Sequence, residues 1–187
     1  MEGIFLVLIG AALFSQSWYV LGMYSEGRSM GIFVAGLGVL SLATLSAAAF
    51  APLLLTGEGK GANMLAETTV MKTMIVAWAL YAVAVGAHGL WDFEERAIGF
   101  YSAFLTVASL VPFIYFAVEL QSRYGDSTWL ALSGAALVLT VLAGMMFFYL
   151  AFSFNVLRLV AGWFLLIGGG AVAAIGLAIV SAVIINT

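Results

Sequence analysis

The sequence predicts an all-α integral membrane protein in which a bundle of six transmembrane helices forms a single domain over residues 1–187. Three observations predict this class. Hydrophobic residues make up 65% of the chain and charged residues only 8%, against roughly 25% charged residues in an average soluble domain. The mean hydropathy is +1.18. Long apolar segments occupy most of the sequence, which leaves no room for a separate soluble domain.

The six expected spans are the apolar segments at about 3–23, 30–55, 71–91, 98–120, 128–153 and 156–185. Each exceeds the roughly 20 residues that a helix needs to cross the hydrocarbon core. Most charged residues lie between these segments, and the exceptions, Lys72, Glu119 and Arg158, lie within three residues of a segment end. Their long side chains can carry the charge to the membrane interface.

The first three spans differ in character. The first begins Met-Glu without a basic segment and has no small-residue cleavage site, so we interpret it as a helix of the mature protein. The second carries Gly31 and Gly38, which favour close helix packing. The third places Trp78 and Tyr81 on one face near its centre. It ends near His88, which we expect to be solvated or to cap the helix rather than to act as a sensor.

The last three spans are marked by a proline, a tryptophan and glycines. Pro112 lies inside the fourth span and is expected to kink it. The fifth has Trp129 near its start, and the sixth contains Gly168-Gly169-Gly170. Each glycine inside a helix costs about 1 kcal/mol relative to alanine in water, so the triplet indicates a packing or flexibility requirement.

Composition excludes several kinds of site. The chain has no cysteine and a single histidine, so it cannot form a thiolate or multi-histidine metal centre by itself, and we expect no metal and no cofactor. The net charge of -3 and a pI near 4.9 give no basic surface for nucleic acid.

The expected membrane interior is polar in places but carries no charge. No Asp, Glu, Lys or Arg lies near the middle of a span, which argues against ion-coupled carriers, voltage sensors and acid–base enzymes. The candidate residues of a solute path are Ser15, Gln16, Trp78, Tyr81, Ser133 and Thr140. Hydroxyl groups can instead bond their own helix, and aromatic rings can simply pack. The amide of Gln16 is costly against lipid and is expected to face the bundle interior.

Several short motifs appear in order along the chain. They are LVLIGAALFSQ in the first span, MGIFVAGLGVLS in the second, then Leu80-Tyr81-Ala82, Gly89-Leu90, Asp92, Arg96, Tyr101-Ser102 and Pro112. Over roughly residues 3–120 this pattern resembles the AmiS/UreI family, bacterial six-helix inner-membrane proteins that pass urea or short-chain amides. The resemblance implies a multi-pass protein of the bacterial inner membrane, a homo-hexamer with one pore per protomer, and both termini outside the cytoplasm.

The final third departs from that family. In that family the fifth helix carries several tryptophans and the sixth carries a buried glutamate. This chain has only Trp129 in the fifth span and no acidic residue in the sixth. The leading hypothesis is a passive channel, not an enzyme, for a small neutral solute such as urea, a short-chain amide or ammonia. The alternative is an accessory or structural subunit of a larger membrane complex. The expected partners are therefore the solute, membrane lipids, and further copies of the chain or the subunits of such a complex.

Orientation can be tested directly. The connections on one side of the membrane carry three basic residues in total, and those on the other side also carry three, so the charge rule leaves the orientation open. The family resemblance implies that residues 56–70 lie outside the cytoplasm. A cysteine introduced at Gly59 is expected to react with an impermeant maleimide added to the periplasmic side. Labelling that occurs only after lysis would contradict this orientation.

Overall fold

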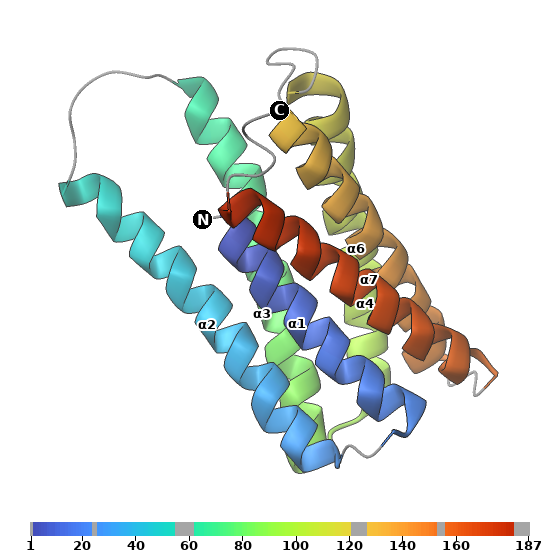
Figure 1. Cartoon of the computed structure of the whole chain (residues 1–187). Coiled ribbons are helices and arrows are strands. Elements are labelled where there is room, and N and C mark those ends of the chain that lie inside the picture. Colours follow the sequence, from blue (N-terminus) through green and yellow to red (C-terminus); the bar gives the residue numbers. More distant parts are fainter. Residues whose placement is uncertain (1, 24–25, 55–61, 121–126, 153–155, 182–187) are drawn as a thin grey trace.

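The computed structural model describes residues 2–23, 26–54, 62–120, 127–152 and 156–181 (Figure 1). Position 59, on which the labelling prediction depends, lies outside these residues. The elements are α1 (Glu2–Leu21), α2 (Gly27–Leu54), α3 (Ala62–Trp91), α4 (Glu95–Ile114), the π-helix η1 (Tyr115–Leu120), α6 (Ser127–Ala151) and α7 (Leu157–Val180).

Six membrane-spanning helices are present within the described residues, and the all-α membrane class is confirmed. Each has the length and apolar composition to cross a bilayer, and η1 continues the fourth of them. Helix α3 begins at Ala62, well before the segment that hydropathy assigned to this span. This difference arises because apolar length measures the hydrocarbon core, whereas a helix can continue into the polar interface. Helix α7 ends at Val180, and residues 182–185 of the expected span lie outside the described residues.

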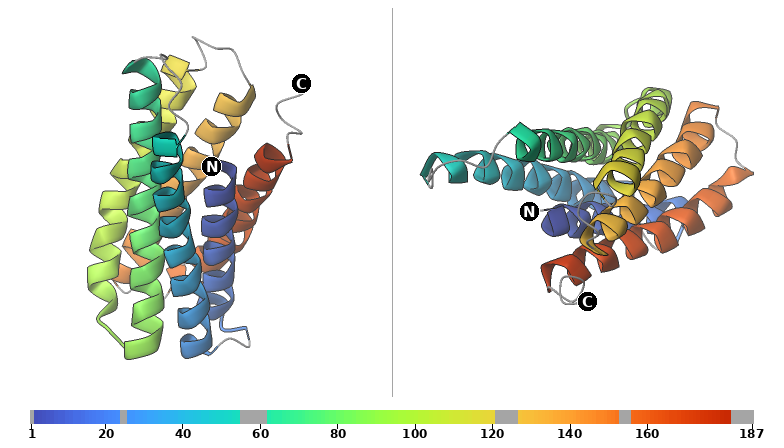
Figure 2. Two further views of the ribbon diagram at one scale, coloured as in Figure 1. Left: turned by 90° about the vertical axis from the view of Figure 1, so that its left-hand side faces the viewer. Right: turned by 90° about the horizontal axis from the view of Figure 1, so that it is seen from above.

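The helices form a closed ring in the order α1, α2, α3, α4, α6 and α7, with α7 returning to α1 (Figure 2). Helix α1 also touches α3 across the interior. Closure brings the start of α1 beside the end of α7, so both lie at one end of the bundle. The largest fully buried side chains are Trp78, Tyr81, Phe5, Phe116, Leu6, Ile9, Leu13, Met74, Leu105, Leu139 and Leu142.

Glycines let α1 and α7 touch backbone to backbone. A Cβ atom built on Gly10 would lie 2.7 Å from the Gly169 carbonyl oxygen, and one on Gly176 would lie 2.7 Å from that of Gly3. The triple glycine is thereby explained in part, because Gly169 faces α1 while Gly168 faces Leu142 of α6. Small residues are the usual means of close approach in lipid, where helices gain no hydrophobic free energy from pairing.

The same device recurs in two other helix pairs. A Cβ on Gly31 of α2 would lie 2.6 Å from the Gly86 carbonyl oxygen of α3. A Cβ on Gly99 of α4 would lie 2.4 Å from the Ala151 nitrogen of α6. The pairs α1–α7, α2–α3 and α4–α6 are therefore the tight units of the ring, and α3 and α4 pack together less extensively.

The fourth span changes its helical geometry near its end. Pro112 lies in the last turn of α4, and the chain continues from Tyr115 as the π-helix η1. A proline removes a backbone donor, and π-turns are one way in which a helix adapts to an interrupted hydrogen-bond ladder.

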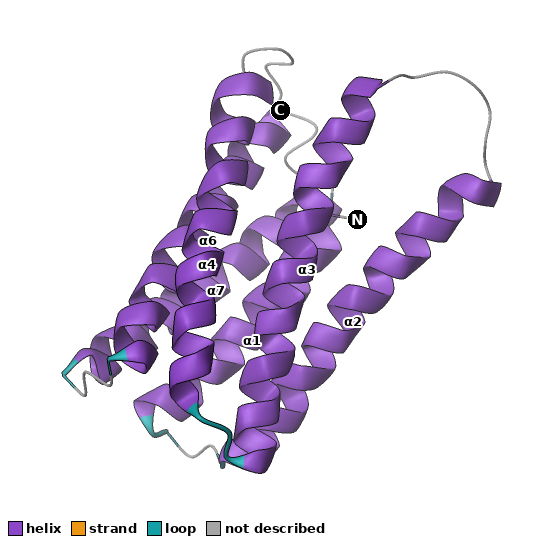
Figure 3. Ribbon diagram, turned by 180° about the vertical axis from the view of Figure 1, so that it is seen from behind, coloured by secondary structure: helices purple, strands orange, loops and turns teal. Residues whose placement is uncertain are grey.

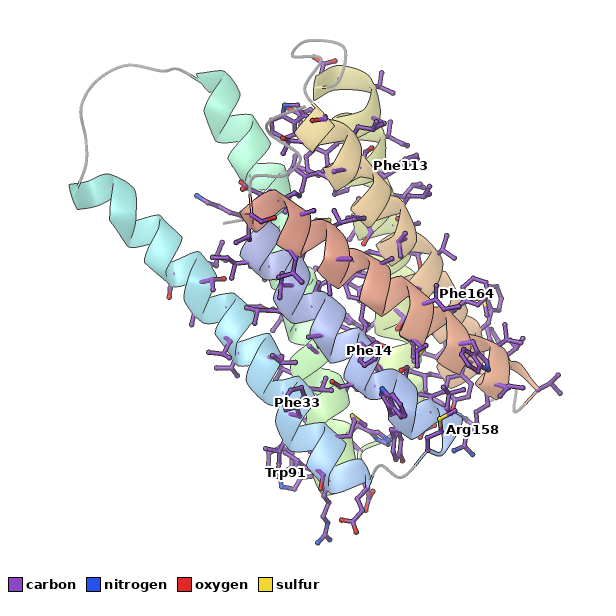
Figure 4. The ribbon with its side chains drawn as sticks, in the orientation of Figure 1. Phe14, Phe33, Trp91, Phe113, Arg158 and Phe164 are labelled. Atoms are coloured by element: carbon purple, nitrogen blue, oxygen red, sulfur yellow. The ribbon has the colours of Figure 1, made fainter. Side chains whose placement is uncertain are left out.

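The outside of the ring is apolar. Phe14, Phe33 and Phe164 project from it, as Figure 4 shows, and Ile32 and Ile167 are more than half exposed. A surface of this kind is suited to hydrocarbon rather than to water.

Helix packing can be tested with a matched pair of glycine substitutions. In Gly10→Ala the new Cβ would lie 2.5 Å from the Ala173 nitrogen, so the α1 and α7 backbones must separate, at an expected cost of about 1–3 kcal/mol in the free energy of unfolding. Gly36→Ala meets no heavy atom within 4 Å and is expected to leave stability unchanged or slightly raised. Unfolding in mixed detergent micelles measures both, and equal effects would contradict the assigned packing.

Candidate solute path between α1, α3 and α4

A line of polar contacts joins α3 to α4 within the membrane. The Trp78 indole Nε1 donates to Ser109 Oγ at 2.8 Å, and the Tyr101 hydroxyl donates to the Ala77 carbonyl oxygen at 2.9 Å. The Ser102 side chain of α4 lies beside the Tyr81 hydroxyl of α3. These contacts define what we call the polar seam. In lipid, such interhelical hydrogen bonds satisfy groups that would otherwise face hydrocarbon.

Gln16 reaches the seam from α1. Its Nε2 donates to the Tyr81 hydroxyl at 3.3 Å, and that hydroxyl lies 3.5 Å from Gln16 Oε1. The Gln16 residue is 4% exposed, and Tyr81 is its one hydrogen-bond partner in the described part of the chain. An amide has two donors and an acceptor oxygen with two lone pairs, so both contacts leave hydrogen-bonding capacity unused.

Two aromatic rings close the middle of the seam. The Trp78 and Tyr81 rings meet edge to face, with centroids 5.4 Å apart and an interplanar angle of 72°. Each residue is 1% exposed. In η1, which follows α4, the buried Phe116 packs against Trp129 of α6 with ring centroids 5.9 Å apart. The interior is therefore filled by side chains at these levels, and the arrangement is closed.

His88 and Glu95 form the last contact of this line, where a short turn joins α3 to α4 (Figure 3). His88 Nε2 lies 3.3 Å from Glu95 Oε1, and His88 Nδ1 hydrogen-bonds to the Phe93 carbonyl oxygen. Asp92, the residue after α3, has a φ of 52° and donates its N–H to the His88 carbonyl oxygen at 2.8 Å. Such a φ lies in the left-handed region, which Asp tolerates better than most residues.

A small cavity of about 30 Å³ lies beside this pair. It is lined by side chains of α1, α2, α3, α4 and α6, among them Gln16, Tyr19, His88, Glu95, Met146 and Tyr149. Its volume suffices for one or two water molecules. We call it the chamber. Gln16 belongs both to the chamber and to the polar seam, and it therefore links the turn at the end of the bundle to the membrane interior.

The structure brings together three of the six residues that the sequence predicted for a path. Gln16, Trp78 and Tyr81 meet at the α1, α3 and α4 junction. The hydroxyls of the other three donate to backbone carbonyl oxygens of their own helices: Ser15 to Ala11, Ser133 to Leu130 and Thr140 to Ala136. Ser133 and Thr140 are buried, whereas Ser15 lines an open surface groove between α1 and α2. A role of each in a path stays a prediction.

Ser102 and Glu95 were not among the predicted path residues. The signal for them lies in spacing, because Glu95, Ser102 and Ser109 recur every seven residues on one face of α4. Tyr81 and His88 are likewise seven residues apart on α3. Folding two such faces back through a short turn pairs His88 with Glu95 and Tyr81 with Ser102, as observed.

Comparisons with known proteins support the fold. No protein-family model matches the chain, and no curated protein matches it. Among solved structures, the urea channel of Helicobacter pylori, determined by cryo-electron microscopy in a closed state, aligns with a TM-score of 0.71 at 15% identity. The alignment covers 96% of this chain and 98% of that channel. The fold expected from the resemblance to the AmiS/UreI family is thus confirmed.

The polar seam predicts energetic coupling between its members. The variants Trp78→Phe and Ser109→Ala each break the 2.8 Å hydrogen bond, so a double-mutant cycle is expected to give a coupling of about 0.5–1.5 kcal/mol in unfolding free energy. Thr106→Val is the matched control, because the Thr106 hydroxyl donates to the Ser102 carbonyl of its own helix. The changes in unfolding free energy caused by Thr106→Val and Trp78→Phe should add. If those caused by Trp78→Phe and Ser109→Ala also simply add, the proposed polar seam is contradicted.

Proposed function

We propose that this protein is a passive channel for a small neutral polar solute such as urea, a short-chain amide or ammonia. The observation that carries the proposal is the polar seam: an uncharged line of hydrogen-bonding groups inside a six-helix ring. The structural likeness to a urea channel supports it independently.

The seam offers a solute what the lipid does not. A neutral solute that leaves water must exchange its hydrogen bonds for new ones, or it pays the full cost of desolvation. Gln16 and Tyr81 can supply both donors and acceptors. An ion would find no opposite charge at this depth, because the described acidic and basic side chains lie outside or near the ends of the membrane-spanning segments. The seam therefore favours neutral solutes.

Passage requires the aromatic pair to move. Trp78 and Tyr81 are almost fully buried and fill the space between α1, α3 and α4. Their hydrogen bonds to Ser109 and to Gln16 hold them in place, so the solute or a movement at the loosely packed α3–α4 contact must release them. Rotation of two rings at a single level is a small change compared with separating whole helices.

The accessory-subunit alternative is less well supported. Its basis is the filled interior and the absence of an acid in α7. A closed channel also has a filled interior, and the structural likeness covers nearly the whole of both chains. We further propose that the protein resides in the bacterial inner membrane as a homo-oligomer, to which the exposed apolar faces of α2 and α7 are suited.

Solute flux tests the proposed function. Proteoliposomes in urea or acetamide gradients are expected to swell faster than empty liposomes, as followed by stopped-flow light scattering. Gln16→Leu removes the buried amide at an expected cost of about 1–3 kcal/mol to passage, which corresponds to roughly 5- to 150-fold slower flux.

The matched control for flux is Phe14→Leu, two residues away on the outward face of α1. It should leave flux unchanged. A Gln16→Leu protein that is folded, reconstituted to the same density and as fast as the parent would contradict the path. Parent liposomes that swell no faster than empty ones would contradict the channel.

A further inference from the structure

A groove opens on the outside of the ring between α1 and α2. Its volume is about 460 Å³, and it extends over roughly two helical turns, from Met23 and Ser29 at the end of the bundle to Phe14 and Phe33 (Figure 4). Met30, which is 4% exposed, lines both this groove and the chamber and forms part of the wall between them. The groove therefore faces the membrane and lies outside the proposed solute path.

The walls of the groove suit a hydrocarbon chain. Phe14 and Trp18 of α1 meet edge to face with ring centroids 6.1 Å apart, and the Ser15 hydroxyl is already bonded to the Ala11 carbonyl oxygen. The volume lies in the range of small-ligand pockets. A helix is about 10–12 Å wide, so two turns of one would need roughly 1,000 Å³. The groove can therefore accept an acyl chain but not a helix of a neighbouring protein.

An acidic side chain lies at the open end of the groove. The Met30 N–H donates to the Glu26 carbonyl oxygen at 3.0 Å, so Glu26 belongs to the first turn that leads into α2. Residues four apart share a helix face, which places Glu26 on the face through which Met30 lines the groove. Glu26 is exposed, and it has no ion-pair partner in the part of the chain that the structure describes. Its carboxylate is therefore available to an external cation.

Groups that bind an anion lie beside this carboxylate. The Ser29 side chain lines the groove, and its hydroxyl has no hydrogen-bond partner among the described residues. Arg28 is exposed at the same level of α2. Residues two apart do not face each other on a helix, so Arg28 and Glu26 are not placed to pair. The rim thus offers separate partners to a positive and a negative group of one molecule.

We propose that the groove is a binding site for phosphatidylethanolamine, a zwitterionic phospholipid with a primary ammonium group. One acyl chain occupies the groove, the phosphate binds Ser29 and Arg28, and the ammonium binds Glu26. Phosphatidylglycerol offers Glu26 no cation, and the quaternary ammonium of phosphatidylcholine has no N–H to donate. The site does not depend on the proposed channel function, because the groove lies outside the path.

The first experiment measures head-group preference. Delipidated protein is titrated with phosphatidylethanolamine, phosphatidylglycerol or phosphatidylcholine of identical acyl chains, and bound lipid is counted by native mass spectrometry. Phosphatidylethanolamine is expected to bind severalfold more tightly than either of the others. Glu26→Gln should remove its advantage over phosphatidylglycerol. The matched control is Glu94→Gln, an exposed acid at the same end of the bundle and outside the groove, which should keep that advantage.

The second experiment fills the groove. Ser29→Trp places a large ring inside it and should lower the binding of all three lipids severalfold. Ser29 is exposed, so the added ring does not disturb the core. Val107→Trp is the control, because Val107 is exposed on α4 and lies away from the groove. It should leave lipid binding unchanged.

Three outcomes would overturn the proposal. Equal parent affinities for phosphatidylethanolamine and phosphatidylglycerol would exclude the assigned head group. Unchanged binding in Ser29→Trp would exclude the groove. The chain has no cysteine, so Ser29→Cys introduces a single thiol. A disulfide between two such chains in intact membranes requires their Cα atoms to come within about 7 Å. Its formation would show that a second copy, not a lipid, covers the groove.

Discussion

Every polar group inside this protein must find its partner within the protein, because the hydrocarbon around it offers none. This constraint selects helices for the backbone and decides where side-chain polarity is tolerated. The hydroxyls of Ser133 and Thr140 meet it locally, each by bonding to a carbonyl of its own helix. Gln16 and Trp78 cannot do so and require a partner on another helix. The polar seam is the place where those partners are concentrated, and the proposed function depends on it.

Glycine packing keeps the seam out of the three tight helix pairs. Backbone contact through Gly10 and Gly169 joins α1 to α7, and Gly31 with Gly86 joins α2 to α3. Such contacts leave no room for polar side chains between the helices. Gly99 allows an equally close backbone contact between α4 and α6 near one end of that pair. Hydrogen-bonding side chains then gather at the looser contact between α3 and α4, where larger residues fit and can move.

The sequence was sufficient for the fold class because apolar length is a one-dimensional property, and it was sufficient for the burial of Gln16 because an amide in lipid is costly. It could not separate Trp78 and Tyr81, which meet, from Ser133 and Thr140, whose hydroxyls satisfy themselves. That distinction depends on which helix faces which, and this follows only once the ring is closed. The contacts of His88 were not predicted for a related reason. Its partners, Phe93 and Glu95, become neighbours through the left-handed turn at Asp92.

The membrane interior of the bundle lacks charged side chains, whereas the ends of the spans carry them, and this distribution limits how such a path can be controlled. Titration changes the charge of a group only where one is present, and the described interior of the bundle holds no acidic, basic or imidazole side chain near its middle. Control by protons must therefore act at the helix ends. His88 and Glu95 lie at such an end, and they line the chamber together with Gln16, whose amide hydrogen-bonds to Tyr81 in the filled interior.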